Sequence, residues 1–398
     1  MTRIYLRIKP LDTLFFRTGT PFGGGEVTWT ESTLLPNPSV IWGAVYSMMM
    51  AHKVVADDSE ENQVKLAIRR VFVEKKRKGH DPEIYVPTPL DLYQYKEENG
   101  IDLLQLDKME NKLLSNYRGA NDYEDKSGYL LKPQKNEVIE RLEQEFIEFS
   151  SICSIDYTYQ NENFGPGLVS TSNLFSKSYK VGIERNNVTK NAEEGKLYRI
   201  NATRFKKGVS LLIEIDLDSE LVDKLPDLGI IKLGGEARGA SFEKLEHHES
   251  ISNLTERIEK EFDEYRSEYI NQQLLFRVYL HSSVLVDLKE RLSNELNREV
   301  SKRLIKENSF KIIAACLGKP ESIGGFSVKS NKPKAMKKAT PKGSVYFMVA
   351  EQNQSYKDIK EAIIKLLQPI EKEQSKKSKI TDEIKGYRQI EIFPSYIK

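Results

Sequence analysis

Hydrophobic and polar positions alternate strictly at the start of the chain. In residues 3–8 the three aliphatic side chains fall on one face of an extended backbone, and two arginines and a tyrosine fall on the other. A period of two over this length predicts a strand with one buried face.

The next regular pattern is helical. After a long loop at 10–26, which carries the triplet Gly23-Gly24-Gly25, Asn37 is the expected N-cap and Pro38 lies in the first turn. The apolar residues that follow lie on one stripe of a helix: Ile41, Ala44, Val45, Met48 and Val55. A strand, a loop and a helix of this size are how a ferredoxin-like (RRM-like) unit begins.

Helical spacing also predicts a second helix over about 59–78 and a third near 136–149, with a polar insertion between them at about 80–135. Residues 196–218 predict a hairpin around a Lys-Lys-Gly turn. A strand at 230–233 then runs into a glycine loop.

The second half of the chain repeats this plan after a charged helix predicted at 246–271. Apolar strands are expected at 274–280 and 344–350, with a helix at 287–306 between them. The length also favours two domains. We therefore predict an α+β protein with two ferredoxin-like (RRM-like) domains that carry glycine-rich loops, residues 1–245 with the insertion and residues 246–398.

Composition narrows the functional classes. The formal net charge is only +2, from 61 basic and 59 acidic residues, so a nucleic-acid site must come from local sorting of charge. Cys153 and Cys316 are far apart, which disfavours a zinc site or a disulfide framework. The first residues do not resemble a signal peptide, and no run of eighteen apolar residues occurs, so we expect a cytoplasmic protein without a membrane span.

Two glycine clusters are candidate phosphate-binding loops. Gly234, Gly235 and Gly239 surround Arg238 directly after a strand, and Gly318, Gly324 and Gly325 form the second cluster. Glycine permits positive φ and close backbone approach, which can leave amide groups free for a ligand. A tight turn explains the same residues equally well, and the spacing fits no nucleotide-binding motif.

Cations gather in two further segments. The stretch 329–342 has no acidic residue and suits a phosphate track, although a solvated loop is the alternative. Its lysines are Lys329, Lys332, Lys334, Lys337, Lys338 and Lys342. The stretch 178–200 interleaves cations with Tyr179 and Tyr198, which fits either a single-stranded nucleic acid or a solvated hairpin. Its principal cations are Lys180, Arg185, Lys190, Lys196 and Arg199. The run of four cations at 75–78 is expected only to close a helix.

Catalytic constellations are sparse. His52 is the one histidine that we consider as a catalyst, with packing or a helix-end charge as the favoured alternative, and His247 and His248 are expected on the surface. Glu214, Asp216 and Asp218 share one face of a strand and could hold Mg²⁺, but a solvated face is favoured. We expect no metal and no cofactor.

Five segments in this order resemble the third-subunit family of type III-B (Cmr) CRISPR complexes, within the RAMP superfamily. They are PLDTLFFRTGTPF at 10–22, YKVGIERNNVTKNAEEGKLYRI at 179–200, LGGEARGA at 233–240, GKPESIGGF at 318–326 and PKGSVYFM at 341–348. The resemblance implies capture of the 5′ handle of the crRNA and docking to the large palm-domain subunit, beside backbone RAMP subunits. It also implies no nuclease activity.

The expected RNA contacts come from three sources. The resemblance carries over to Arg17, Lys180, Arg185, Arg238, Gly324 and Gly325, and the glycine loop around Arg238 adds Gly234, Gly235 and Gly239. Local charge adds Arg204, Lys329, Lys332, Lys334 and Lys337. Two other functions stay open: a RAMP endoribonuclease that processes the crRNA precursor through His52, and a structural bridge that touches no RNA. The insertion and the C-terminal stretch KGYRQIEIF depart from the family pattern.

Overall fold

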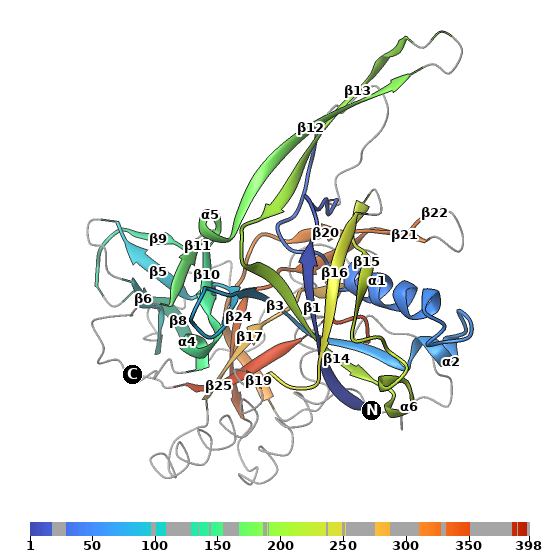
Figure 1. The fold of residues 1–398 in the computed structure, drawn as a ribbon. Helices are drawn as coiled ribbons and strands as arrows, with labels where there is room; N and C mark the ends of the chain where they lie inside the picture. The colour runs from blue at the N-terminus through green and yellow to red at the C-terminus, as the bar shows by residue number, and fades with distance from the viewer. Residues whose placement is uncertain are drawn as a thin grey trace.

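Strands dominate the structure. The computed structural model describes residues 1–17, 29–96, 101–108, 129–133, 135–142, 145–153, 167–185, 189, 191–235, 238–248, 251, 275–286, 310–327, 332–350, 384–387 and 389–395. These residues form a mixed α/β, strand-rich protein with several mainly antiparallel sheets (Figure 1). The mixed class agrees with the sequence prediction.

The largest sheet has eight strands, and every neighbouring pair is antiparallel. In spatial order they are β11 (Leu168–Ser170), β10 (Glu145–Glu148), β4 (Glu83–Pro87), β3 (Leu66–Lys75), β14 (Val209–Leu217), β1 (Thr2–Pro10), β16 (Gly239–Leu245) and β15 (Leu228–Lys232). The predicted strand at 3–8 is confirmed as β1, and the predicted strand at 230–233 overlaps β15.

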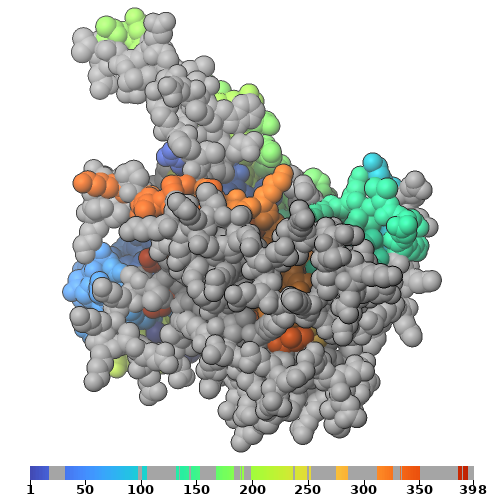
Figure 2. Space-filling model, turned by 180° about the vertical axis from the view of Figure 1, so that it is seen from behind, coloured from blue at the N-terminus to red at the C-terminus, as the bar shows by residue number. Residues whose placement is uncertain are grey.

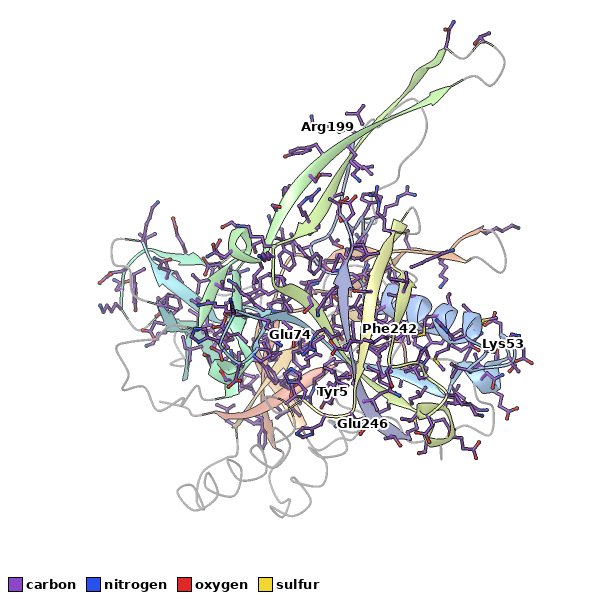
Figure 3. The ribbon with its side chains drawn as sticks, in the orientation of Figure 1. Tyr5, Lys53, Glu74, Arg199, Phe242 and Glu246 are labelled. Carbon is purple, nitrogen blue, oxygen red and sulfur yellow. The ribbon has the colours of Figure 1, made fainter. Side chains whose placement is uncertain are left out.

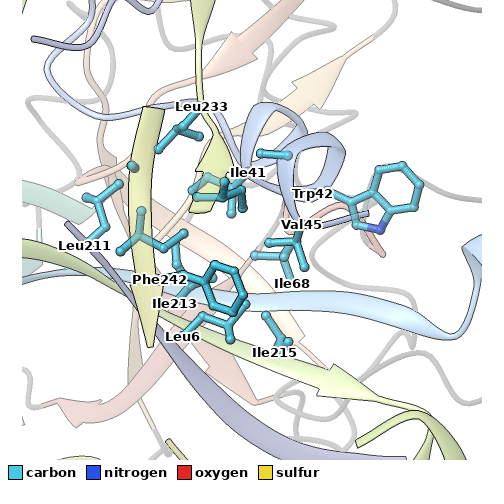
Figure 4. Packing of buried hydrophobic residues seen from close by; sticks show 14 of the residues in the cluster. Leu6, Ile41, Trp42, Val45, Ile68, Leu211, Ile213, Ile215, Leu233 and Phe242 are labelled. Carbon is cyan, nitrogen blue, oxygen red and sulfur yellow. The ribbon is translucent and has the colours of Figure 1, made fainter. Parts of the chain in front are cut away.

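Helix α1 (Pro38–Ala51) covers one face of this sheet. It begins after Asn37 as predicted, and its apolar stripe is buried. Figure 4 shows Ile41 and Val45 against Leu6 and Ile213 of the central strands. This cluster contains the aliphatic face of β1, so the alternation in residues 3–8 has the expected consequence.

The other face of the same strands holds buried ion pairs. Arg7 Nε of β1 lies 2.6 Å from Glu74 Oε2 of β3, and Ser210 and His248 also bond Glu74. Burial alone would raise the pKa of Glu74, but the hydrogen bonds from His248, Arg7 and Ser210 lower it to about 2. Glu74 therefore stays ionised although it is buried, and Figure 3 labels it within the body of the protein.

Two expectations about this face are wrong. Glu214 and Asp216 share a face as predicted, but that face is buried, and their partners include Arg3, Arg69 and Arg70. His248 is also buried, whereas His247 is exposed. The strand pattern indicates the shared face but cannot indicate the second layer that covers it.

That second layer is a four-stranded sheet in the order β19 (Phe310–Cys316), β24 (Val345–Ala350), β17 (Leu275–Leu280) and β25 (Ile390–Ser395). Numbered by appearance in the chain, the order is second, third, first, fourth. The central strands of the large sheet, β3-β14-β1-β16, follow the same order. One hydrophobic cluster joins the layers, with Phe72 and Leu212 from the first and Phe276 and Tyr346 from the second.

Shorter elements surround these layers. The small sheets are β12 (Phe175–Arg185), β13 (Ala192–Phe205) and β2 (Trp29–Glu31); β6 (Ile101–Leu103), β5 (Leu92–Tyr95) and β9 (Ile139–Arg141); β7 (Gln105–Lys108) and β8 (Tyr129–Lys132); β18 (Val284–Val286), β23 (Lys337–Thr340) and β20 (Glu321–Ile323); and β21 (Phe326–Ser327) and β22 (Lys332–Pro333). The short helices are α2 (Glu60–Gln63), α4 (Phe149–Cys153), α5 (Thr171–Leu174) and α6 (Ser219–Val222).

The predicted helix at 59–78 is wrong. Only α2 is helical there, and Leu66–Lys75 forms β3 with much of both faces buried. A strand covered on both sides lacks the alternation that identifies a half-buried strand. The cations at 75–78 consequently follow a strand, and Arg77 pairs with Glu83 at 3.3 Å.

The predicted helix at 136–149 is also wrong, since this segment contains β9 and β10. The predicted insertion at 80–135 begins too early, because β4 belongs to the large sheet. In the segment 196–218 the turn at Gly208 is present, with φ +83°, but β13 and β14 pair with other strands and do not form a hairpin together.

Other predictions fall outside the described residues. Gly23-Gly24-Gly25 and the predicted helix at 287–306 lie wholly outside them, and the predicted helix at 246–271 almost wholly. Apolar strands are confirmed at β17 and β24. Among the described residues, no helix has the length and apolar character needed to cross a membrane.

A buried salt bridge joins the two layers. The guanidinium of Arg277 on β17 donates two hydrogen bonds to the carboxylate of Asp91, which precedes β5, and both side chains are almost completely buried. Tyr279 Oη on the same strand donates to the carbonyl of Pro87 at 2.7 Å. Both contacts fix β17 against the end of β4 and the loop that follows it.

We expect Asp91→Ala to lower the free energy of unfolding by about 3–5 kcal/mol, because it leaves the Arg277 charge buried without its carboxylate. The double variant Asp91→Leu with Arg277→Met should lose clearly less, since both charges are removed. Urea unfolding of the purified chain measures both.

The matched control is the exposed pair of Lys96 and Glu140, 3.7 Å apart. Glu140→Ala should cost less than about 1 kcal/mol. Equal losses for Asp91→Ala and Glu140→Ala would contradict a role of the buried pair in holding the layers together.

Candidate nucleic-acid interface

The loop after β1, residues 11–17, is held between two other segments by main-chain hydrogen bonds. Leu11 N–H donates to the carbonyl of Gly239 at 3.1 Å. Leu14 and Thr203 of β13 exchange two hydrogen bonds of 2.8 Å. The loop therefore connects the root of β13 to the glycine loop at 234–239.

The glycines at 234 and 235 allow this loop to approach closely. Gly234 has φ +79°, and a Cβ atom there would lie 2.7 Å from the carbonyl oxygen of Phe15. A Cβ atom at Gly235 would lie 2.9 Å from the ring of Phe15. Gly235 N–H donates to the Phe15 carbonyl at 2.8 Å. The expectation that this amide is free for a ligand is therefore wrong, because the turn itself uses it.

Three of the predicted cations meet at one carboxylate. The carboxylate oxygens of Asp12 lie 3.3 Å from Lys180 Nζ of β12 and 3.3 Å from a guanidinium nitrogen of Arg204 on β13. A guanidinium nitrogen of Arg238 is 3.5 Å away. Arg238 also donates to Thr13 Oγ1 at 3.2 Å. We call these four residues, Asp12, Lys180, Arg204 and Arg238, the Asp12 cluster. It keeps a net positive charge, since three cations face one carboxylate.

The carboxylate of this cluster is ionised. The hydrogen bond from the Thr13 backbone lowers the pKa of Asp12 most, partial burial opposes this, and Lys180 and Arg204 lower it further. Asp12 was not predicted as a site residue, because an acidic side chain is not expected to contact RNA. Its position shortly after the strand at 3–8, within the segment 10–22 that resembles the family, was the available signal.

Strands β12 and β13 form a long hairpin that rises away from the body of the protein (Figure 1). Their register places Lys180 and Arg204 on one face of the ribbon, and Tyr179, Val181 and Arg199 on the other. The Arg199 guanidinium lies 4.4 Å from the centroid of the Tyr179 ring, and Tyr179 and Val181 are exposed. The hairpin thus has one face that enters the Asp12 cluster and one with an exposed aromatic ring.

The other predicted site residues are distributed around this region. Arg17 is exposed and its backbone bridges Ser32. The backbone of Arg185 ends β12, while its side chain and all of Lys329 lie outside the described residues. A Cβ atom at Gly239 would lie 3.3 Å from Leu11 Cδ1 of the loop.

The second glycine cluster packs against the segment β21 to β23, which carries Lys332, Lys334 and Lys337 and which we call the basic arm. Lys334 N–H donates to the carbonyl of Gly325 at 2.8 Å, and a Cβ atom at Gly324 would meet Met336. Lys332 and Lys334 are exposed, and Lys337 is partly buried on β23. Figures 1 and 2 place β20 to β22 along the end of the body from which the hairpin rises. The arm and the Asp12 cluster therefore lie at the same end of the protein.

Lys342 does not belong to this arm. It lines a small pocket at the start of α1, together with Arg69, His281 and Ser282, and burial lowers its pKa. His281 bonds the backbone of Val71, and burial lowers its pKa to about 3, so it is neutral. Lys342 is therefore partly enclosed beside α1 and does not extend the exposed lysine track.

The candidate catalyst His52 lies elsewhere. It is exposed and caps the C-terminal end of α1. Figure 3 shows its neighbour Lys53 at the outer end of α1, well away from Arg199 on the hairpin. Among the described ranges, no group of three or more metal-ligating side chains could hold a metal ion.

Comparison with known proteins identifies the family. The family model for the CRISPR-associated protein Cas_Cmr3 matches residues 6–378, which confirms the resemblance drawn from five segments. No curated protein matches the chain.

Among solved structures the chain is similar to a subunit of the type III-B Cmr-beta complex bound to cognate target RNA, with 17% identity, a TM-score of 0.45 and coverage of 97% of this chain and 95% of that one. For the same complex bound to target RNA and AMPPnP, the identity is 19%, the TM-score is 0.44, and the match covers 91% of this chain and 92% of that one. For a chain of the Csm3-Csm4 subcomplex of the type III-A interference complex, the identity is 16%, the TM-score is 0.37, and the match covers 86% of this chain and 92% of that one. These likenesses are distant, and the assignment rests on the family match. That match extends over almost the whole sequence, and the protein therefore belongs to the CRISPR-associated Cas_Cmr3 family.

Proposed function

We propose that this protein is the RNA-binding subunit of a type III-B CRISPR effector that holds the 5′ handle of the crRNA. The observation that carries the proposal is the convergence of Lys180, Arg204 and Arg238 from three separate segments on one exposed spot. Membership of the Cas_Cmr3 family gives the biological setting.

The two cationic regions have different roles in this proposal. Arg238 is largely enclosed, with its side chain 15% exposed, and its planar guanidinium suits a phosphate or a base edge in a fixed geometry. Lys332 and Lys334 are exposed point charges that suit the sugar–phosphate backbone. Arg238 therefore contributes sequence preference, and the arm contributes general affinity.

The repeated strand order supports a finer description of the fold. An antiparallel sheet in which the first and third strands are central, as in β3-β14-β1-β16 and β19-β24-β17-β25, is the arrangement of a ferredoxin-like unit. We propose two such RAMP domains, with a boundary near residue 245. In the first, the hairpin belongs to the segment between the second and third strands.

The third part of the proposal concerns partners. A handle-binding chain works within a particle, and we propose that it docks to the large palm-domain subunit beside the backbone RAMP subunits. The pair should remain associated after ribonuclease treatment, because protein contacts hold it. Gel filtration of the treated pair at micromolar concentration measures this. Separation of the two proteins would refute the docking proposal.

We also propose that the protein is not a nuclease. The exposed position of His52 at the C-terminal end of α1, on an element that contributes nothing to the Asp12 cluster, supports this. In the assembled particle, His52→Ala should leave guide length and target cleavage unchanged, as should the control His247→Ala. General acid–base catalysis contributes about 10²–10⁴-fold to a rate. A loss of that size for His52→Ala alone would restore the endoribonuclease alternative.

The handle proposal predicts unequal effects of two variants on the binding of native and scrambled handle RNAs. Arg238→Ala should weaken the native handle by about 1–3 kcal/mol more than the scrambled one if it reads a base edge. Replacing Lys332, Lys334 and Lys337 with alanine should weaken the binding of both RNAs equally. It should also reduce the slope of the logarithm of the binding constant against the logarithm of the salt concentration, by up to about 0.7 per lost contact. Binding across a salt series by the pair with the large subunit gives both quantities.

The matched control is Lys224→Ala. Lys224 is exposed next to α6, at the end of the body opposite the hairpin, and its loss changes the net charge by the same amount as Arg238→Ala. Lys224→Ala should leave the binding of both RNAs unchanged. Equal losses on both RNAs for Arg238→Ala would reduce that residue to a general phosphate contact.

A further inference from the structure

The position of the Asp12 carboxylate is set by the fold. Residues on both sides of it, Leu11 and Leu14, are fixed by main-chain hydrogen bonds to Gly239 and Thr203. Thr13 next to it is completely buried. The backbone at Asp12 is therefore held at the place where the hairpin, the glycine loop and the end of β1 meet, and the carboxylate faces all three cations.

The contacts of Asp12 are those that a phosphate group would make. A carboxylate and a phosphate both offer anionic oxygens to lysine and arginine donors. The three ion pairs of Asp12 measure 3.3–3.5 Å, longer than tight charge-assisted hydrogen bonds, and its side chain is 52% exposed. Exposed pairs of this kind are weak and easily exchanged.

Removal of the carboxylate would not dismantle the rest of the cluster. Arg238 has a second hydrogen bond to Thr13 Oγ1, and Lys180 and Arg204 project from paired strands. The three cations would stay near their places with one more unit of net positive charge. Asp12 thus neutralises part of a binding surface without building it.

We propose that Asp12 is an internal competitor for RNA phosphate: it occupies the phosphate position among Lys180, Arg204 and Arg238 and so lowers the affinity of the protein for every RNA. The inference rests on the proposed function, since it concerns regulation of the same site. An RNA must displace the carboxylate before its phosphate can reach the three cations. An RNA that contacts only these cations therefore binds too weakly to occupy the site. The native handle, with its additional contacts, still binds. The carboxylate thus sets the affinity that an RNA must exceed to occupy the site, without changing the ratio between the affinities of two RNAs.

The test is Asp12→Asn in the purified full chain, because asparagine keeps the size and the oxygen that can accept from Thr13 N–H. We expect native and scrambled handle RNAs to bind about tenfold more tightly, since one opposing charge a few ångströms from the phosphate is removed. The slope of the logarithm of the binding constant against the logarithm of the salt concentration should become steeper by up to about 0.7, the value for one phosphate contact of a single strand. Unchanged or weaker binding would overturn the proposal, and weaker binding would make Asp12 a positioning residue.

The matched control is Asp227→Asn. Asp227 is an exposed carboxylate 2.8 Å from Lys244, next to β15, and its replacement changes the net charge identically. It should leave RNA binding unchanged. An equal gain in both variants would show a general charge effect and contradict a specific role of Asp12.

A third probe separates this inference from the handle proposal. Inorganic tripolyphosphate has no bases, so calorimetry with it reports phosphate binding without any contribution from base recognition. If wild type shows no preference for the native handle, the handle proposal fails, whereas a gain in tripolyphosphate affinity for Asp12→Asn still supports the competitor. If wild type prefers the native handle but Asp12→Asn does not raise the affinity for either RNA or for tripolyphosphate, only the proposal that Asp12 is a competitor fails.

Discussion

Strand β1 has to satisfy two different environments at once, and much of the architecture depends on how it does so. Its aliphatic side chains enter the core beneath α1, while Arg3 and Arg7 lie on the opposite face, where Arg7 is largely buried and Arg3 is partly exposed. A buried arginine is tolerated only with a carboxylate close by, because desolvation of an unpaired charge is costly. Glu74 on β3 and Glu214 on β14 meet this requirement. A slip of one residue in β1 would place charges in the apolar core, so the ion pairs and the core specify the same register.

This register also positions the candidate interface. Where β1 ends, the chain passes directly into the loop at 11–17, which is bonded to β13 on one side and to the glycine loop on the other. The cations of the Asp12 cluster therefore stand on three segments that share a rigid origin. Pre-organisation of this kind reduces the cost of ordering side chains when a ligand binds. The glycines contribute by allowing close packing of backbone, and Gly235 uses its amide for that purpose.

Local patterns predicted the elements that have one apolar face. Residues 3–8 and the helix after Asn37 follow from periodicity and capping chemistry. Strand β3 did not, because burial on both faces removes the alternation, and its apolar spacing also fits a helix. The burial of His248 and Glu214 depends on a sheet contributed by residues far along the chain. Lys180, Arg204 and Arg238 could be chosen for charge and family resemblance. Their meeting at Asp12 could not be predicted, since it requires the tertiary path of three distant segments.

The position of the hairpin in the sequence, between two paired strands of the large sheet, affects how the chain reaches its native state. Strand β3 ends at Lys75, and its partner β14 begins only at Val209, with the hairpin and β4 to β11 in between. During synthesis β3 therefore emerges long before its partner, and one of its edges stays unpaired until that partner arrives. The entropy of closing such a long loop grows only slowly with length, so the final pairing is stable once formed, but contacts of this sequence separation slow folding. The element that reaches farthest from the protein thus prolongs the time during which its central sheet is open to wrong partners.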